Sequence, residues 1–264
     1  MIISLSWIDI LLAALPLLIL IALLAYMRLG VSRQLLTGAL RTLVQLSLVG
    51  AVLTAVFENE NPLWTIGFSM VMICAGTYEV TRRQNRKFLA GWSAALSLIG
   101  LLSAAVLSTG YALMVVLDVD PWWKPQYAIP LLGMILGNTM NGVSLGLNTL
   151  TNGVWQQRAV IENRLALGQS AQESVRDIKR DCLRNALTPI MNSLAVCGVV
   201  SLPGMMTGQI LAGNDPQVAA RYQMMIMYLI GTGCAAGCLV TVSLASHRLF
   251  DKRDRLRLDR LVLK

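Results

Sequence analysis

The side chains of this chain that could do chemistry are polar residues embedded in long apolar segments. One segment carries Met134, Asn138, Asn141, Asn148 and Asn152, which share one face of a helix that turns about 100° per residue. An Asn side chain is costly in hydrocarbon unless it is hydrogen-bonded, so this face must point at protein or water. Two interpretations stay open: the asparagines hold helices together, or they line a transport pathway.

A second polar group joins two neighbouring apolar segments. Arg41 and Gln45 lie one helical turn apart in the first segment, and Glu79 lies near the end of the next. The opposite charges of Arg41 and Glu79 favour an ion pair between the helices. The pair could be structural, or it could act as a gate or an ion sensor; alternatively, Arg41 extends to the membrane interface.

The third polar region contains the stretch SLPGMMTGQILAG. A Pro followed directly by Gly is expected to break a helix, and broken helices at membrane depth often line a cavity. Methionine usually fills gaps, and its thioether suits Cu(I) better than Fe(II), so the residues leave a metal site unknown. The candidate pathway residues of this region are Asn192, Pro203, Gly204, Met205, Met206 and Gln209.

Signatures of enzymatic chemistry are missing from the sequence. It contains no G-x4-G-K-[ST] loop for nucleotide phosphates, no H-E-x-x-H zinc motif and no G-x-S-x-G nucleophile motif. The only histidine is His247, at the end of the last apolar segment. We therefore expect a protein that is not an enzyme and that carries no cofactor, with any ATP hydrolysed on another subunit.

Membrane-spanning helices must position these residues. Of the 264 residues, 55% are hydrophobic and only 14% are charged. Charge is excluded from several windows of about 20 residues, the length that a helix needs to cross a hydrocarbon core of about 30 Å. The expected fold is an all-α polytopic membrane protein with seven transmembrane helices. The expected spans are Ile8–Met27, Leu35–Phe57, Pro62–Val80, Trp92–Leu117, Tyr127–Thr151, Ala186–Leu211 and Tyr222–Ser246.

The placement of basic residues indicates the orientation. Twenty of the 22 Lys and Arg residues lie in four clusters in every second loop, and the other loops hold only Lys124 and Arg221. By the positive-inside rule the clustered loops are cytoplasmic, so the N-terminus is outside and the C-terminus is cytoplasmic. The net charge of +8 is therefore a topology signal and not a sign of nucleic-acid binding.

The loops are too short for a domain outside the membrane. Residues 1–264 are expected to form a single transmembrane domain, whose largest loop, residues 153–185, is cytoplasmic and joins spans five and six. No internal repeat is evident, which disfavours a transporter built from two inverted halves. Seven spans without a repeat resemble half of a pore and favour a symmetric dimer. None of the five cysteines lies in an outer loop, so no disulfide framework is expected.

The cytoplasmic loop contains a polar stretch, ENRLALGQSAQESVRDI, with helical propensity. We expect Gly168 to end a short helix that carries Leu165 and Leu167. Ser170 and Glu173 have the spacing of a capping box, which predicts that a second helix follows. A short helix held below the membrane by a turn can dock into a groove of a partner. An ordinary helix at the membrane interface is the alternative.

The spacing of Glu162, Gly168 and Ile178 resembles the Glu-x5-Gly-x9-Ile part of the coupling loop of ATP-binding-cassette permeases. The likeness ends there, because Arg180 and Asp181 follow where importers usually have Leu-Pro. A longer resemblance covers nearly the whole chain. The stretches RLALG, TPIMNS and SLPGMMTGQILAG, then Pro216 and Tyr222-Gln223, resemble the FetB-type iron-export permeases, which are related to plant aluminium-tolerance membrane proteins.

This resemblance implies a multi-pass permease subunit of the bacterial cytoplasmic (inner) membrane. It implies a homodimer that works with two copies of a separate ATP-binding subunit, where ATP and Mg are held, and that exports iron by alternating access. It also implies a role for the segment from Glu162 to Gly168: these residues would form the coupling helix seated on the ATPase. The implied coupling residues are Glu162, Leu165, Leu167 and Gly168.

Other functions are compatible with parts of the sequence. A permease for another metal or for a nucleotide-sugar would need the same architecture. A retinal protein would need a Lys in the last span, and residues 222–246 contain none. A secondary transporter usually carries acidic residues within its spans, where this chain has only Glu79 near membrane depth.

Overall fold

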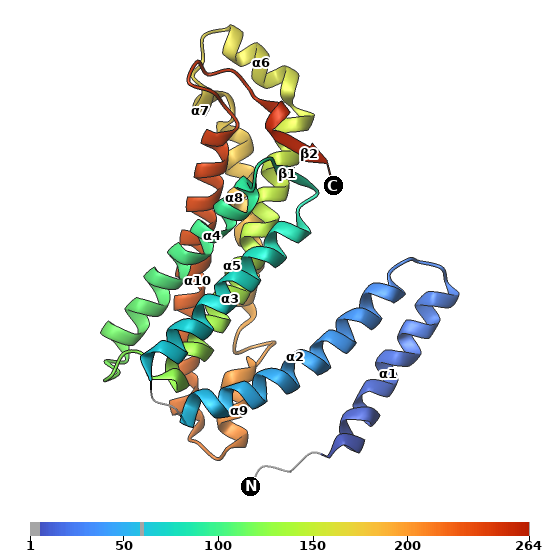
Figure 1. Cartoon of the computed structure of the whole chain (residues 1–264), viewed down its shortest axis with the longest axis vertical. Helices are drawn as coiled ribbons and strands as arrows, with labels where there is room; N and C mark the ends of the chain where they lie inside the picture. Colours follow the sequence, from blue (N-terminus) through green and yellow to red (C-terminus); the bar gives the residue numbers. More distant parts are fainter. Residues whose placement is uncertain (1–5, 59–60, 264) are drawn as a thin grey trace.

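The structure is a computed structural model that describes residues 6–58 and 61–263 (Figure 1). It is mostly helical, and the expected all-α polytopic fold is confirmed in that respect. The long helices are α1 (Trp7–Tyr26), α2 (Ser32–Glu58), α3 (Pro62–Arg83), α4 (Trp92–Ala104), α5 (Pro125–Gln156), α8 (Arg176–Val196) and α10 (Pro216–Arg248). The short elements are α6 (Arg158–Ala166), α7 (Ala171–Ser174), α9 (Gly204–Leu211), the π-helices η1 (Ala105–Gly110) and η2 (Ala112–Val116), the 3-10 helix η3 (Leu258–Arg260), and strands β1 (Arg86–Phe88) and β2 (Leu261–Leu263).

Six helical stretches of the described chain are long and apolar enough to cross a membrane. They are α1, α2, α3, α5, α10 and the continuous helix Trp92–Val116, and they coincide with six of the seven expected spans. The expected sixth span is a broken one. Helix α8 ends at Val196, the chain then turns with a bridge between Cys197 and Ser201, and α9 begins after Pro203. The predicted break is confirmed, and the exact number of crossings stays a prediction.

Helices α5 and α10 form the centre of the bundle, and α3, α4 and α8 pack around them. Small residues set the distance between the central helices. A Cβ atom at Gly142 would lie 2.8 Å from Cys238 Sγ and 2.9 Å from Cys234 Sγ, so only glycine fits there. The two cysteines are buried packing residues.

Helices α1 and α2 form a hairpin that projects from the side of the bundle (Figure 1). Of their described residues, α1 buries Ile21 and α2 buries Val56, while the other side chains are half-buried or exposed. Helix α1 has a mean hydropathy of 2.8 over its most apolar window. Such a surface is stable only when lipid or another apolar surface covers it.

The basic loop after α3, the loop between α5 and α8 and the C-terminal segment gather at one end of the molecule, while the basic turn between α1 and α2 lies on the projecting hairpin. Figure 1 shows α6, α7, β1 and β2 at this end, with α9 and the start of α1 at the other. The two strands pair antiparallel, with Arg86 opposite Leu263 and Phe88 opposite Leu261. The alternation of loops predicted from charge therefore agrees with the arrangement of the helices, and which end faces the cytoplasm stays a prediction. For clarity we call this the basic end and the opposite one the outer end.

Candidate functional site

The candidate coupling element is the helix–turn–helix of α6 and α7. Gly168 ends the turn of α6 with a φ of +89°, a left-handed conformation that favours glycine. Its N–H donates to the Leu165 carbonyl at 3.0 Å, and the N–H of Gln169 donates to the Arg164 carbonyl at 3.1 Å. The predicted glycine turn is confirmed, and it forces the chain to reverse at the tip of the basic end.

The start of α7 is fixed by the predicted capping box. The Ser170 side chain accepts a hydrogen bond from the N–H of Glu173. The Glu173 carboxylate accepts one from the Ser170 N–H at 2.9 Å and one from its hydroxyl at 2.7 Å. These bonds stabilise the charged form, so the pKa of Glu173 lies below its usual value. A short helix with both orphan donors satisfied is a rigid support for the turn.

The two leucines of the coupling element point in different directions. Leu167 is 84% exposed at the tip, whereas Leu165 packs against the core. We expected one short helix to carry both leucines, whereas α6 ends at Ala166, so Leu165 anchors the helix and Leu167 projects just beyond its end. Glu162 is exposed on α6 and lines a cleft of about 360 Å³ together with Leu165 and the segment 253–256.

Arg164 locks the coupling element to α8. Its Nη2 pairs with Asp177 Oδ2 at 2.9 Å, and its Nη1 donates to the Ser174 carbonyl at 3.2 Å. On the far side of α7, the Gln172 amide lies 3.3 Å from His247 Nδ1. The interfacial histidine therefore belongs to this support. These contacts join the turn to α8 and to the end of α10.

The predicted ion pair of Arg41 and Glu79 is confirmed, within a larger cluster. Glu79 accepts a hydrogen bond from Arg83 Nε at 3.0 Å, and its carboxylate lies 3.8 Å from Arg41 Nη1 and 3.9 Å from Arg82 Nη1. Arg41 is the polar link between the projecting hairpin and α3. Gln45 is exposed one turn along α2, away from this cluster.

Two of the four asparagines of α5, Asn141 and Asn148, bond to the end of α3 and the residues after it, which fits the interpretation that they hold helices together. Asn141 Oδ1 accepts from Arg83 Nη1 at 2.8 Å. Asn148 accepts from the N–H of Asn85 at 2.9 Å and donates to the Arg83 carbonyl at 3.2 Å. Asn138 instead donates to the Met134 carbonyl of its own helix at 2.9 Å. These contacts hold the end of α3 against the middle of α5.

A cavity of about 350 Å³ lies at the outer end, between α5, α9 and α10. It brings together three of the predicted pathway residues, Met134, Met205 and Gln209. Gln209 Oε1 is buried and is without a hydrogen-bond partner among the described residues. The lining is completed by Leu117, Gln126, Tyr127, Pro130, Leu131, Asn214, Val218, Tyr222, Met225 and Ile226.

The other predicted pathway residues do not line this cavity. Asn192 and Gly204 are exposed, and Pro203 and Met206 are half-buried near the break. The aromatic and methionine side chains that α10 adds were missed by sequence reasoning. Tyr222 and Met225 stand three residues apart, a helical spacing that could have placed both on one face.

The chemistry of the cavity is neutral. Its lining offers thioethers, phenols and carboxamides, and none of its lining residues is Asp, Glu, Lys, Arg or His. Within the described ranges, no group of three or more His, Cys, Asp or Glu side chains could hold a metal ion. The cavity can therefore offer polarizable sulfur and uncharged oxygen donors, but no carboxylate.

Comparison with known proteins assigns the family. The model of the uncharacterised protein family UPF0014 matches residues 7–250. The chain belongs to the UPF0014 family. The UPF0014 membrane protein slr1647 of Synechocystis is 37% identical over 89% of this chain and 90% of the relative. The probable iron export permease protein FetB of Escherichia coli is 29% identical over 90% of this chain and 89% of the relative.

A plant relative belongs to the same set. Protein ALUMINUM SENSITIVE 3 of Arabidopsis thaliana is 28% identical over 93% of this UPF0014 chain and 88% of its own length. No solved structure matches the chain. The resemblance found in the sequence motifs is confirmed: this UPF0014 protein is a membrane protein related to the FetB permease and to plant aluminium-sensitivity proteins.

Proposed function

We propose that this UPF0014 protein is the membrane-spanning subunit of an ATP-binding-cassette exporter. The observation that carries the proposal is the coupling element: a glycine-locked turn at the tip of the basic end, with Leu167 84% exposed. A large apolar side chain held out by a rigid support is suited to insertion into a groove of a soluble partner. The partner would be the ATP-binding subunit, where ATP and Mg are held.

The working unit would be a homodimer of this chain with two ATPase subunits. Support comes from the hairpin of α1 and α2, which leaves the polar residues of α2 outside the bundle. Residues such as Gln34 and Gln45 are unfavourable against lipid. A second copy of the chain would cover them across a two-fold axis, and the hairpins would then close a pathway between the two bundles.

Alternating access would follow from the way α8 is built. The coupling element joins α5 to α8 and is locked to α8 through Arg164 and Asp177. Motion of the ATPase would move α8 as a rigid rod, and the break between Val196 and Gly204 would let α9 respond at the outer end. The cavity beside α9 would then open or close around its cargo.

Iron is the proposed cargo, in an export direction, because a relative over nine-tenths of the chain is named a probable iron export permease. Another metal or a nucleotide-sugar is the second candidate. A specific observation favours it, because the outer cavity holds no carboxylate and Glu79 is shared by three arginines. A secondary transporter is less well supported. Such a transporter usually needs an acidic residue that binds the coupling ion, and here the outer cavity is lined by none and Glu79 is paired with arginines.

The coupling role is tested by ATP turnover of the purified permease–ATPase complex. Leu167→Asp is expected to lower substrate-stimulated turnover at least tenfold and to weaken binding of the ATPase. Leu89→Asp is the matched control, because Leu89 is also an exposed leucine of a loop at the basic end. Equal turnover for Leu167→Asp and the unaltered chain would remove the docking assignment.

The cargo is tested in cells. Deleting the gene together with that of its ATPase is expected to raise intracellular iron and to reduce tolerance of combined iron and peroxide stress. Complementation with the unaltered gene, and with a Leu167→Asp copy, separates transport from other effects of the deletion. Unchanged iron content and unchanged tolerance would favour a different substrate.

A further inference from the structure

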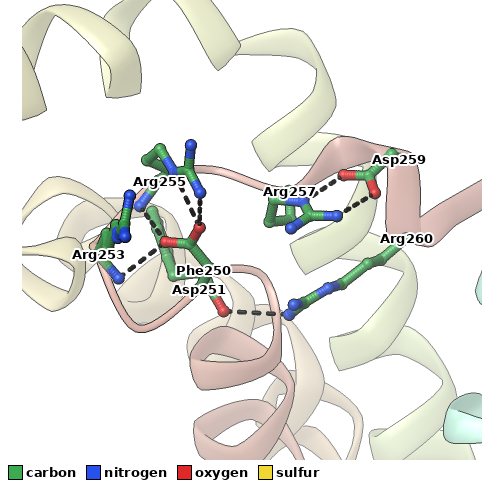
Figure 2. Close-up of polar contacts among 7 residues, drawn as sticks. All are labelled: Phe250, Asp251, Arg253, Arg255, Arg257, Asp259 and Arg260. Atoms are coloured by element: carbon green, nitrogen blue, oxygen red, sulfur yellow. Dashed lines mark hydrogen bonds and ion pairs between the residues drawn. The ribbon is translucent and has the colours of Figure 1, made fainter.

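Beyond the coupling element, the basic end contains a pocket of about 550 Å³ where α10 gives way to the C-terminal segment. The segment leaves α10 at Leu249, turns through residues 251–255 and returns to pair with β1 (Figures 1 and 2). Five of the seven residues that line the pocket are basic and one is acidic. The lining consists of Arg248, Phe250, Asp251, Lys252, Arg253, Arg255 and Arg260.

The acidic residue does not neutralise the pocket. Asp251 Oδ1 accepts from the N–H groups of Arg253 and Arg255, each at 2.9 Å. Asp251 Oδ2 accepts from Arg255 Nε at 2.9 Å and lies 2.8 Å from Arg255 Nη2 (Figure 2). Both oxygens are therefore occupied by one turn of chain. Asp251 pairs with Arg255, so the other four basic side chains of the lining are not balanced by a carboxylate of the lining.

Two of these charges are held in place by the fold. Arg260 Nη1 donates to the carbonyls of Arg248 at 2.8 Å and Phe250 at 3.1 Å, which caps the end of α10. The Arg248 guanidinium lies 4.2 Å from the centroid of the Trp92 ring. Cations that are already oriented lose little freedom when an anion arrives.

The other two charges are available to a ligand. Lys252 and Arg253 are exposed, and within the described ranges neither side chain forms an ion pair. In Figure 2 the Arg253 side chain stands clear of the Asp251 carboxylate, which binds only its backbone N–H. The pocket thus combines two fixed cations, Arg248 and Arg260, with two free ones on the turn between them.

The depth of the pocket in the membrane follows from α10. Between Arg221 and His247 the helix carries no charged residue over 25 positions. That length exceeds the roughly 20 residues needed to cross the hydrocarbon, so Arg248 lies close to the boundary. Trp92, which contacts Arg248, is the kind of residue found at the level of the lipid headgroups. Arg248 and Trp92 therefore place this side of the pocket near the expected level of lipid phosphate groups.

We infer that this pocket binds a phosphate-bearing anion, the headgroup of an anionic phospholipid. Guanidinium groups match the geometry of phosphate oxygens, and basic pockets at the cytoplasmic side of membrane helices suit such headgroups. The inference does not depend on the proposed transport activity. Free inorganic phosphate has the same chemistry, and the test separates the two sources.

The test counts lipids retained by the full chain. The protein is purified in neutral detergent and titrated with mixed micelles that contain phosphatidylglycerol or phosphatidylcholine, and bound lipid is counted by native mass spectrometry. The expected result is one tightly retained phosphatidylglycerol per chain. Lys252→Gln with Arg253→Gln should weaken it by more than tenfold, since each basic residue near a charged surface contributes about fivefold.

A charge-matched control guards against a general surface effect. Arg158→Gln with Arg180→Gln removes two exposed basic residues that lie outside the pocket. Equal loss of phosphatidylglycerol in both double variants, or no loss in either, would overturn the inference. Displacement of the lipid by an excess of inorganic phosphate would overturn the assignment to a lipid and identify free phosphate as the ligand of the site. Retention against phosphate would identify the lipid as the ligand.

Discussion

The two ends of the molecule are built in opposite ways. At the basic end, Arg164, Glu173, Asp251 and Arg260 each make two or more polar contacts, and a short β-ladder ties the C-terminal segment to the loop after α3. At the outer end, α9 is a helix of eight residues that follows a break and buries none of them. A rigid end suits the transmission of force, and a loosely held end suits a response to it.

The largest expected effect comes from breaking the rigid end at Arg260. Arg260→Ala removes two charge-assisted hydrogen bonds to the last carbonyls of α10. We expect a loss of about 2 kcal/mol of unfolding free energy, measured by thermal unfolding in detergent. Arg257→Ala is the control, because Arg257 pairs with Asp259 at the surface and should cost less than about 1 kcal/mol. Equal destabilisation would mean that the contacts to α10 carry no special weight.

Gly168→Ala tests the lock of the coupling turn. Alanine at a φ of +89° is strained by about 1 kcal/mol, so the turn should open and ATP coupling should fall several-fold. Gly67→Ala is the control, since Gly67 lies in open space within α3 and alanine favours a helix. The measurement is substrate-stimulated ATP turnover of the complex. A Gly168→Ala protein that couples normally would show that the turn tolerates other geometries.

At the outer end, Gln209→Leu separates transport from stability. It removes a buried amide oxygen that has no partner among the described residues, so unfolding should change by less than about 1 kcal/mol. Transport into inverted vesicles should nevertheless fall, because this variant removes the polar group that we propose contacts the cargo. Asn214→Leu serves as a second cavity variant. A destabilised protein with normal transport would assign Gln209 a structural role instead.

The smallest effect near neutral pH concerns Asp251. The N–H of Arg255, then the N–H of Arg253 and the Arg255 guanidinium, hold the pKa of Asp251 at about 2, below the ordinary 3.8. A lowered carboxyl pKa stabilises the fold above about pH 4, and this stability is lost as the pH falls from about 4 to about 2. Asp251→Asn should abolish that part of the acid transition in detergent. An acid transition that is unchanged in Asp251→Asn would mean that other carboxylates cause it.

The features that could be predicted from the sequence are those set by residues close together along the chain. The apolar windows placed six helical spans, the Pro-Gly pair predicted the broken helix, and the spacing of Ser170 and Glu173 predicted the capping box. The pair of Arg41 and Glu79 followed from charge alone. The first three features depend on a few neighbouring residues, and the ion pair could be predicted because Glu79 is the acidic residue nearest membrane depth for Arg41 to meet.

Contacts between distant segments could not be predicted in this way. The outer cavity needs the relative rotation of α5, α9 and α10, which no periodicity within one helix determines. Whether Leu165 is buried and Leu167 is exposed depends on how α6 is oriented against the rest of the bundle. Likewise, the basic residues after α10 entered the sequence analysis only as positive charge, whereas residues 251–263 form a turn, a cap and a strand.

The pairing of β1 with β2 makes the chain from Arg86 to Leu263 a closed ring. A single backbone cut between the two strands leaves two fragments that the β-ladder can still hold together. Two fragments divided in the outer loop at Gly213, and produced separately in one cell, would each keep one strand of the ladder. The ladder and the packing of α10 on α5 would then guide their reassembly, which makes this loop the natural place to insert a reporter domain.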